Sequence, residues 1–288
     1  MIDRAVINQA LTNQTLTNQA ATHEAVTNES ADMVQPLPAV LPEPIVLLHG
    51  VGLDRTMWEP LQAELAALTG RPALALDLPG HGGQPPLTSP ATLAGLAADV
   101  AARMPGPAHV VGFSLGALVA QHLALHRPEL VATLTSVSSV CSRTPEEAAS
   151  VRSRLENARR DFAGSVEASI ERWYPEGSGV DAGTVARTRT TLLANSEESY
   201  LYAYEVFATA DAEIGPELGR IAVPALAVTG ELDPGSTPEM TRRLGRAVPG
   251  SRTAVVRGAH HMLPVEQPRE LALTIHRFIE ESSRENHE

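Results

Sequence analysis

The chain has 288 residues, of which 43% are hydrophobic, so it is long enough for one large α/β domain with a packed core. Its 34 acidic residues outnumber its 22 basic residues, all arginines, and the net charge of -12 disfavours nucleic acid and anionic lipid surfaces as partners. The absence of lysine excludes a lysine nucleophile, and the single cysteine, Cys141, permits no internal disulfide. Because no secretory signal pattern opens the chain and no apolar run suits a membrane span, we expect a cytoplasmic protein.

Residues 6–30 repeat with a period of five, from Val-Ile-Asn-Gln-Ala to Val-Thr-Asn-Glu-Ser. Five steps rotate a helical position by about 140°, and an odd period alternates between the two faces of a strand, so neither conformation gathers an apolar face. The tract is too short for a stacked solenoid, and disorder is the better interpretation. With the proline-rich stretch that follows, residues 1–44 are expected to form a disordered tail and linker that folding and catalysis do not need.

Strand-like apolar runs alternate with helical patterns along most of the remaining chain. The runs predict strands at 45–48, 73–76, 109–113, 130–137, 223–229 and 252–256. The expected helix starts are a Thr56 and Glu59 capping box, Ser89-Pro90, the turn after Ser114, Thr237-Pro238 and Pro268. This alternation predicts an α/β protein with a doubly wound, mostly parallel sheet built from residues 45–140 and 219–288. Such sheets place their chemistry at the carboxyl ends of the strands.

Residues 141–218 interrupt the alternation and show only helical patterns, which predicts an inserted helical cap. Seven of the ten aromatic residues lie in it: Phe162, Trp173, Tyr174, Tyr200, Tyr202, Tyr204 and Phe207. We expect most of them to form the small core of the cap and a minority to face the substrate pocket.

Ser114 stands in Gly-Phe-Ser-Leu-Gly, between a strand-like run and a helical pattern. A strand, a sharp turn and a helix in this order expose a nucleophile at the apex, and glycines at 112 and 116 leave room for backbone that passes close by. A simple glycine-flanked loop serine would not explain the strand, the helix and the partners described next.

A serine hydroxyl needs a general base, and the base needs a carboxylate that fixes its tautomer. His261 and Asp233 each follow a predicted strand, and the order Ser114, Asp233, His261 is the one expected on a parallel sheet. Asp233 as a helix-capping loop residue is the plainer alternative, and Glu231 is the reserve acid. His260, one residue before His261, is expected to point elsewhere.

Two backbone N–H groups are expected to form the oxyanion hole. Leu115 begins the helix after the nucleophile, and Val51 lies between two glycines in the loop after the first strand. His49 at the start of that loop is expected to have a structural role. The ten histidines are scattered without metal-ligand spacing, and no nucleotide-binding glycine pattern is present, so we expect neither a metal nor a cofactor.

From Ile45 to Glu280 the chain resembles the serine-nucleophile branch of the α/β-hydrolase family. The resemblance depends on motifs at residues 49–52, 77–82, 112–116, 230–233 and 261–268. It implies an eight-stranded fold with a cap, and serine-triad hydrolysis of an ester, lactone or thioester without a cofactor. Members of the family also have an antiparallel strand pair before the position of Ile45, which the repeat and prolines of this chain do not resemble, so the sheet is expected to have six strands.

The cap is similar to that of the 3-oxoadipate enol-lactonases at residues 171–174, 198–200 and 230–238. This similarity, together with arginines of the cap, suggests that the acyl group of the substrate is small and anionic. Each arginine by itself is expected on a solvated helix face. The arginines are Arg143, Arg152, Arg154, Arg172 and Arg187. The sequence thus predicts a carboxylesterase or lactonase that forms an acyl-enzyme on Ser114 and acts on a small-molecule substrate. The oligomeric state has no sequence signal.

Other functions of the same fold stay open at this point. Perhydrolases, acyltransferases and lyases of the family share the triad, and a non-catalytic receptor or scaffold is a further alternative. Dehalogenase and epoxide-hydrolase chemistry is disfavoured, because Ser114 stands where those relatives have an aspartate nucleophile.

Overall fold

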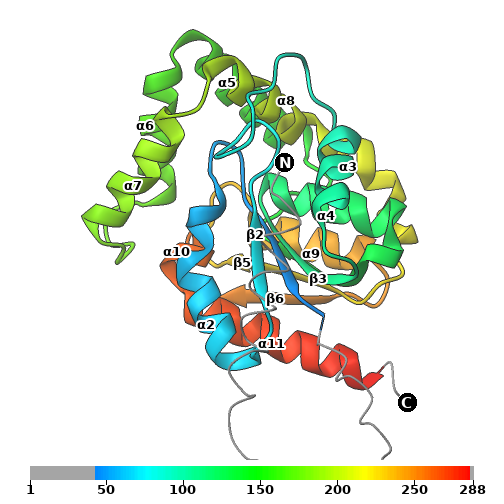
Figure 1. Ribbon diagram of the computed structural model, residues 1–288. Coiled ribbons are helices and arrows are strands. Elements are labelled where there is room, and N and C mark those ends of the chain that lie inside the picture. Colours follow the sequence, from blue (N-terminus) through cyan, green and yellow to red (C-terminus); the bar gives the residue numbers. More distant parts are fainter. Residues whose placement is uncertain (1–42, 286–288) are drawn as a thin grey trace, which may run out of the picture. The chain divides into compact units, whose positions relative to one another are not determined.

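The computed structural model describes residues 43–285, which contain one six-stranded sheet with the order β2-β1-β3-β4-β5-β6 (Figure 1). All its strand pairs are parallel. The strands are β1 Ile45–Leu48, β2 Ala73–Leu76, β3 Ala108–Phe113, β4 Val131–Val137, β5 Ala225–Gly230 and β6 Arg252–Val256. The expected doubly wound parallel sheet is confirmed. The expectation for the tail falls almost entirely on residues outside the described part of the chain.

Helices cover both faces of the sheet, as the alternating pattern predicts (Figure 1). Helices α2 (Glu59–Thr69) and α11 (Pro268–Glu285) pack together on one face. Helices α3 (Leu93–Arg103), α4 (Leu115–His126) and α9 (Pro238–Ala247) cover the other. Short helices complete the connections: η2 Arg55–Trp58, η3 Pro128–Leu130, η4 Gly215–Arg220 and α10 Leu263–Glu266. The central strands β1, β3 and β5 are buried along their whole length, which explains why they are mostly apolar, with His109 of β3 and Thr229 of β5 as buried polar exceptions.

Four helices lie between β4 and β5, at the end of the sheet where the strands finish (Figure 1). They are α5 Pro145–Arg160, α6 Phe162–Trp173, α7 Ala182–Leu193 and α8 Glu197–Ile214. Thr144 and Glu147 form the capping box that begins α5, and Asp161 caps α6. No helix within residues 43–285 combines the length and apolar character needed to cross a membrane.

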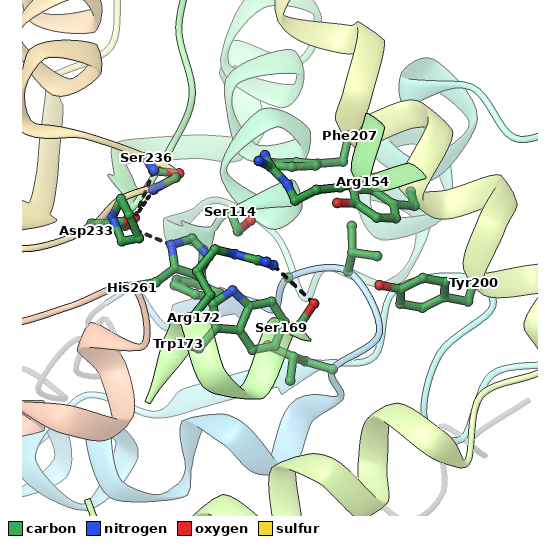
Figure 2. A pocket seen from close by; sticks show the side chains of 17 residues that line it. Ser114, Arg154, Ser169, Arg172, Trp173, Tyr200, Phe207, Asp233, Ser236 and His261 are labelled. Carbon is green, nitrogen blue, oxygen red and sulfur yellow. Dashed lines mark hydrogen bonds and ion pairs between the residues drawn. The ribbon is translucent and has the colours of Figure 1, made fainter. Parts of the chain in front are cut away.

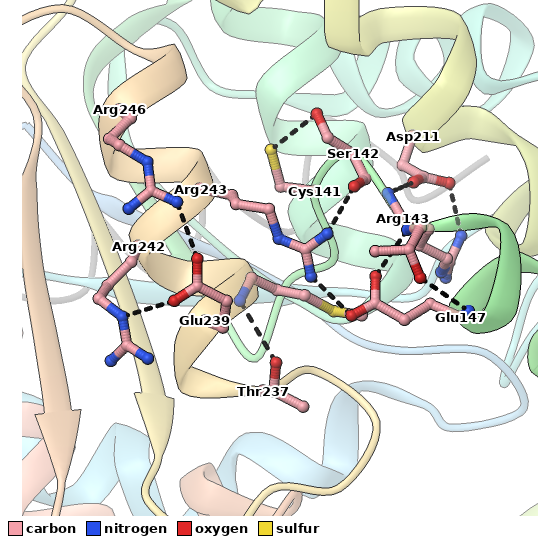
Figure 3. Close-up of polar contacts among 12 residues, drawn as sticks. Cys141, Ser142, Arg143, Glu147, Asp211, Thr237, Glu239, Arg242, Arg243 and Arg246 are labelled. Carbon is pink, nitrogen blue, oxygen red and sulfur yellow. Dashed lines mark hydrogen bonds and ion pairs between the residues drawn. The ribbon is translucent and has the colours of Figure 1, made fainter.

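Polar contacts join the two ends of this helical segment to each other and to the core (Figure 3). Just before α5, the Arg143 guanidinium forms a buried ion pair with Asp211 of α8, at 2.5 Å, and lies over the Phe207 ring. Arg243 of α9 donates to the Ser142 carbonyl at 2.6 Å and pairs with Glu147 at 2.7 Å. The segment with helices α5–α8 therefore begins and ends at one cluster of charged side chains.

Two predicted helix starts are wrong. The first turn after β1 is capped by Asp54, whose carboxylate accepts the Thr56 N–H at 2.9 Å, and no Thr56–Glu59 capping box forms. Helix α3 begins at Leu93 with Thr92 as its cap, three residues after the predicted Ser89-Pro90 start. In both cases a nearby Asp or Thr accepts a free N–H group of the first helical turn. Which polar residue acts as the cap depends on where the preceding loop ends.

Candidate active site

Ser114 lies at the turn between β3 and α4, in a backbone conformation with φ 53° and ψ -112°. This region is sparsely populated by residues with a side chain, so the turn is strained. A Cβ atom at Gly112 would lie 2.1 Å from the Gly116 carbonyl oxygen, and one at Gly116 would lie 2.1 Å from the Leu48 carbonyl oxygen. The two glycines are therefore required by close backbone contacts, and the turn holds Ser114 at the edge of the pocket.

Asp233 follows β5 and His261 follows β6, and the two side chains meet. The Nδ1 atom of His261 lies 2.7 Å from Oδ2 of Asp233, and both residues are buried. The other oxygen of Asp233 accepts the N–H groups of Gly235 and Ser236 at 2.9 and 2.8 Å. Burial opposes ionisation of Asp233, but His261 and these N–H groups outweigh it and hold the pKa of Asp233 below its usual value.

The imidazole of His261 contacts two aromatic rings, with 5.0 Å between its centroid and that of Phe113 and 5.7 Å between its centroid and that of Trp173. Ser138, at the end of β4, donates its hydroxyl to the His261 carbonyl at 3.2 Å. Sequence reasoning assigned Ser138 no role. Its positive φ of 46°, which among the described non-glycine residues only Ser114 and Ser142 share, is a signal visible only in the structure.

His260 and Glu231 take up other partners. Both the backbone N–H and the Nδ1 atom of His260 contact the Glu266 carboxylate, at 2.6 and 2.7 Å. The exposed Glu231 accepts the Gly258 N–H at 2.9 Å. The structure thus brings the side chains of His261 and Asp233 into contact, whereas His260 and Glu231 contact other residues.

Ser114, Asp233 and His261 line one pocket between the sheet and the cap (Figure 2). Loop residues Gly50 and Val51 reach the pocket from the end of β1. The N–H groups of Val51 and Leu115 have no acceptor among the described residues. An N–H group without an acceptor can donate to a bound oxyanion, and this remains the role expected for the two groups.

His49 is completely buried and has a structural role in the loop. It donates from Nδ1 to the Gly50 carbonyl at 2.8 Å and accepts the Leu78 N–H on Nε2 at 2.9 Å. This pair of contacts requires the neutral ring. Burial, assisted by the nearby His81, lowers the pKa of His49 well below its usual value.

The cap contributes more aromatic residues to the pocket than the sequence suggested. Four of the seven line it: Trp173, Tyr200, Tyr204 and Phe207. Phe162 packs against Tyr200, Tyr174 contacts the Thr188 hydroxyl, and Tyr202 contacts Glu198 on the surface. The expectation that only a minority faces the pocket is wrong, because α8 brings three aromatic residues to the pocket at helical spacing and α6 adds Trp173 from its last turn.

Within residues 43–285, no three His, Cys, Asp or Glu side chains gather as a metal site would need. The adjacent histidines His260 and His261 bind different carboxylates, Glu266 and Asp233. The chemistry that this site offers from its own residues is therefore that of a serine, a histidine and an aspartate.

A parallel sheet with a strained serine turn after β3 and a buried His–Asp pair at the ends of β5 and β6 defines an enzyme of the hydrolase class. Residues 45–273 match the model of the Alpha/beta hydrolase family. The chain belongs to the α/β-hydrolase family.

Curated relatives are similar over most of the chain. One is the (E)-2-((N-methylformamido)methylene)succinate hydrolase of Acinetobacter baylyi, 28% identical over 243 residues, which are 83% of this chain and 90% of that protein. Another is the pimeloyl-(acyl-carrier protein) methyl ester esterase of Neisseria meningitidis serogroup B, 31% identical over 244 residues, 82% of this chain and 92% of that protein. Among solved structures, the enol-lactonase from Burkholderia xenovorans has a TM-score of 0.73 and 27% identity, covering 83% of this chain and 92% of that one.

Proposed function

We propose that this enzyme hydrolyses a small ester or lactone through an acyl-enzyme on Ser114. The observation that carries the proposal is the 2.7 Å contact between His261 and Asp233 in the pocket that Ser114 lines. The contact supports the tautomer in which Nδ1 of His261 carries the proton and donates it to Asp233. Nε2 is then free to accept a proton from the serine hydroxyl.

In the first half-reaction, Oγ of Ser114 attacks the carbonyl carbon and its proton passes to Nε2 of His261. The carbonyl oxygen becomes an oxyanion that the N–H groups of Val51 and Leu115 stabilise, an effect worth about 10² to 10³ in rate for each donor. The imidazolium then protonates the leaving alkoxide, and the C–O bond breaks. In a lactone the leaving oxygen stays attached to the acyl group, so the ring opens.

In the second half-reaction, a water molecule gives its proton to Nε2 of His261 and attacks the acyl carbon. The tetrahedral intermediate collapses, Ser114 recovers its proton, and the free acid leaves. Asp233 stabilises the imidazolium in both halves and does not itself take the proton. We also propose that residues 141–218 act as the cap that shapes the acyl pocket, since α5, α6 and α8 all contribute residues to it.

Three measurements test the proposal. A panel of p-nitrophenyl esters and simple lactones should be hydrolysed by the native chain and not by Ser114→Ala. A fluorophosphonate should label Ser114, as peptide mass spectrometry would show. Turnover in H₂¹⁸O should place one heavy oxygen in the product acid, whereas transfer to a different acceptor would give a new acylated product without heavy oxygen in place of the acid. A chain that neither reacts with the probe nor hydrolyses any acyl substrate would be a scaffold.

A further inference from the structure

Two arginines of the cap reach the pocket that contains Ser114. Arg154 lies on α5 and Arg172 on α6, and Figure 2 shows both side chains extending toward Ser114 from these helices. Arg172 donates to the Ser169 hydroxyl at 3.1 Å and to the Ala168 carbonyl at 3.3 Å. Arg154 donates to the Ser150 hydroxyl at 2.8 Å. Among the described residues, neither guanidinium has a carboxylate partner.

Other arginines of the cap do have such partners. Arg143 pairs with Asp211, Arg159 pairs with Glu156 and Glu205, and Arg189 pairs with Glu167. Of the five cap arginines singled out from the sequence, Arg154 and Arg172 line this pocket, while Arg187 lines a separate one and Arg152 is exposed.

The charges around the pocket are unbalanced. Its single carboxylate is that of Asp233, whose two oxygens are already engaged by His261 and by two backbone N–H groups. Burial lowers the pKa of Arg172, and the positive charge of Arg154 lowers it further, so the two guanidinium groups repel each other. Tyr204, Tyr200 and Asp233 oppose this lowering with smaller effects. This excess of positive charge occurs in a chain whose net charge is -12. A bound anion would relieve it.

The opposite wall offers neutral donors. Tyr200 and Tyr204 of α8 line the pocket, and their hydroxyls have no hydrogen-bond partner among the described residues. Burial raises the pKa of Tyr200, so its hydroxyl keeps its proton and can donate. Guanidinium and phenol groups together present several N–H and O–H donors and no free carboxylate, which is the composition of an anion site.

We propose that Arg172, assisted by Arg154, binds a carboxylate of the substrate, so that the preferred substrates are small esters or lactones bearing a second, ionised acid group. This inference rests on the proposed function, because it names the substrate class of the same pocket. A guanidinium pairs with a carboxylate through two parallel hydrogen bonds, which fixes the position of the substrate as well as adding affinity. Its contribution is therefore expected in both KM and kcat.

The test compares two esters of equal chain length, monoethyl glutarate and ethyl valerate, in which a carboxylate replaces a methyl group. Hydrolysis is followed by titration of the released acid, with Ser114→Ala as the blank. The native enzyme should prefer monoethyl glutarate by about 100-fold in kcat/KM, and Arg172→Gln should lose about 10- to 100-fold on this ester, the range of a charged hydrogen bond. The kcat/KM of Arg172→Gln on ethyl valerate should differ from that of the native enzyme by less than about 3-fold. On monoethyl glutarate, Arg172→Lys should retain more kcat/KM than Arg172→Gln. Arg154→Gln should lose less kcat/KM than Arg172→Gln.

Arg152→Gln, on the same helix as Arg154 but exposed, is the matched control and should behave like the native enzyme. Equal rates for the two esters, or an equal loss on both in Arg172→Gln, would overturn the anion site and leave the proposed function intact. Calorimetry with glutarate tests the case in which the anion site exists but the protein hydrolyses neither ester. If neither ester is hydrolysed but glutarate binds the native protein and not Arg172→Gln, the anion site stands and ester hydrolysis does not. If glutarate binds both proteins equally, the anion site is refuted.

Discussion

The indole ring of Trp173 lies on the imidazole of His261, with 5.7 Å between the ring centroids and 30° between the planes. One residue belongs to the last turn of α6 in the cap, and the other follows β6 in the core. The candidate general base is therefore positioned by two separate parts of the chain, through its contact with Asp233 on one side and with the cap on the other.

Trp173→Ala should lower kcat on p-nitrophenyl acetate by about 10- to 100-fold, because a small displacement of the base costs this much in a preorganised site. Steady-state kinetics well below the melting temperature measure the effect. Tyr202→Ala, which removes a partly exposed aromatic ring that does not line the pocket, should retain native kcat. If the two variants lose the same activity, the contact with His261 has no special role.

The adjacent histidines should differ sharply. His261→Ala should lower kcat by about 10³- to 10⁶-fold, as should Ser114→Ala, and the double variant should be no slower than either, because the groups act as a unit. His260→Ala should lower kcat by less than about 10-fold, because it removes only the side-chain contact with Glu266 that supports the loop. Single-turnover and steady-state kinetics of the four proteins give the comparison. An inactive His260→Ala beside an active His261→Ala would place the base at position 260.

Gly116→Ala should destabilise the fold, because its Cβ would lie 2.1 Å from the Leu48 carbonyl oxygen and 2.6 Å from that of His49. Moving backbone in the central sheet should cost about 3 kcal/mol of unfolding free energy, which is equivalent to roughly 6 to 12 °C in melting temperature. Thermal unfolding followed by circular dichroism measures it. Gly83→Ala is the control, since its Cβ meets a single carboxylate oxygen at 3.4 Å. An equal loss in both variants would contradict the argument.

His109 should make the fold sensitive to acid. Burial, aided by Arg71 and opposed by Glu43, lowers the pKa of His109 to about 4. The unfolded chain takes up this proton near pH 6.5, so the stabilisation is complete above that value and is lost as the pH falls toward 4. Over this range the single residue should cost about 3 kcal/mol of unfolding free energy.

Urea unfolding at several pH values between 7 and 4 tests this prediction. His109→Gln retains a side chain able to bond the Thr133 hydroxyl, which lies 3.0 Å from Nδ1 of His109, and removes the titration. The variant should lose less stability than the native chain between pH 6.5 and 4. Parallel curves for the two proteins would mean that other groups, such as the buried His49 and His81, carry the whole dependence.

The order of strands and helices was predictable from the sequence, because strands buried on both faces must be continuous apolar runs and the helices between them need one apolar stripe. Ser114 could be predicted because the glycines at 112 and 116 are required by close backbone contacts, which leave a recognisable local sequence pattern. Asp233 and His261 followed from the rule that parallel strands bring their carboxyl ends to one edge. Helix starts were less certain, since Asp54 and Thr92 compete with neighbouring Thr and Ser residues for the same N–H groups.

The pocket walls could not be predicted in the same way. Whether Arg172 or Arg187 faces the pocket depends on how α6 and α7 rotate against the sheet, which no local pattern encodes. The same holds for Tyr200 against Tyr202, two residues apart on α8, of which one is buried and the other contacts Glu198 at the surface. Ser138 shows its importance only through its contact with the carbonyl of a residue 123 positions later.

The Arg143–Asp211 pair joins residues 68 positions apart, so the cap leaves and re-enters the core at almost the same point. Because its two ends are fixed to each other, we expect that the length and the helices of this segment can change without moving the strands that it joins. Evolution could thus alter which substrates a common serine site accepts without redesigning the sheet. A helical segment transplanted into this sheet would need an ion pair equivalent to Arg143–Asp211 between its two ends. It would also need an acidic residue in the place of Glu147 to pair with Arg243 of the sheet domain.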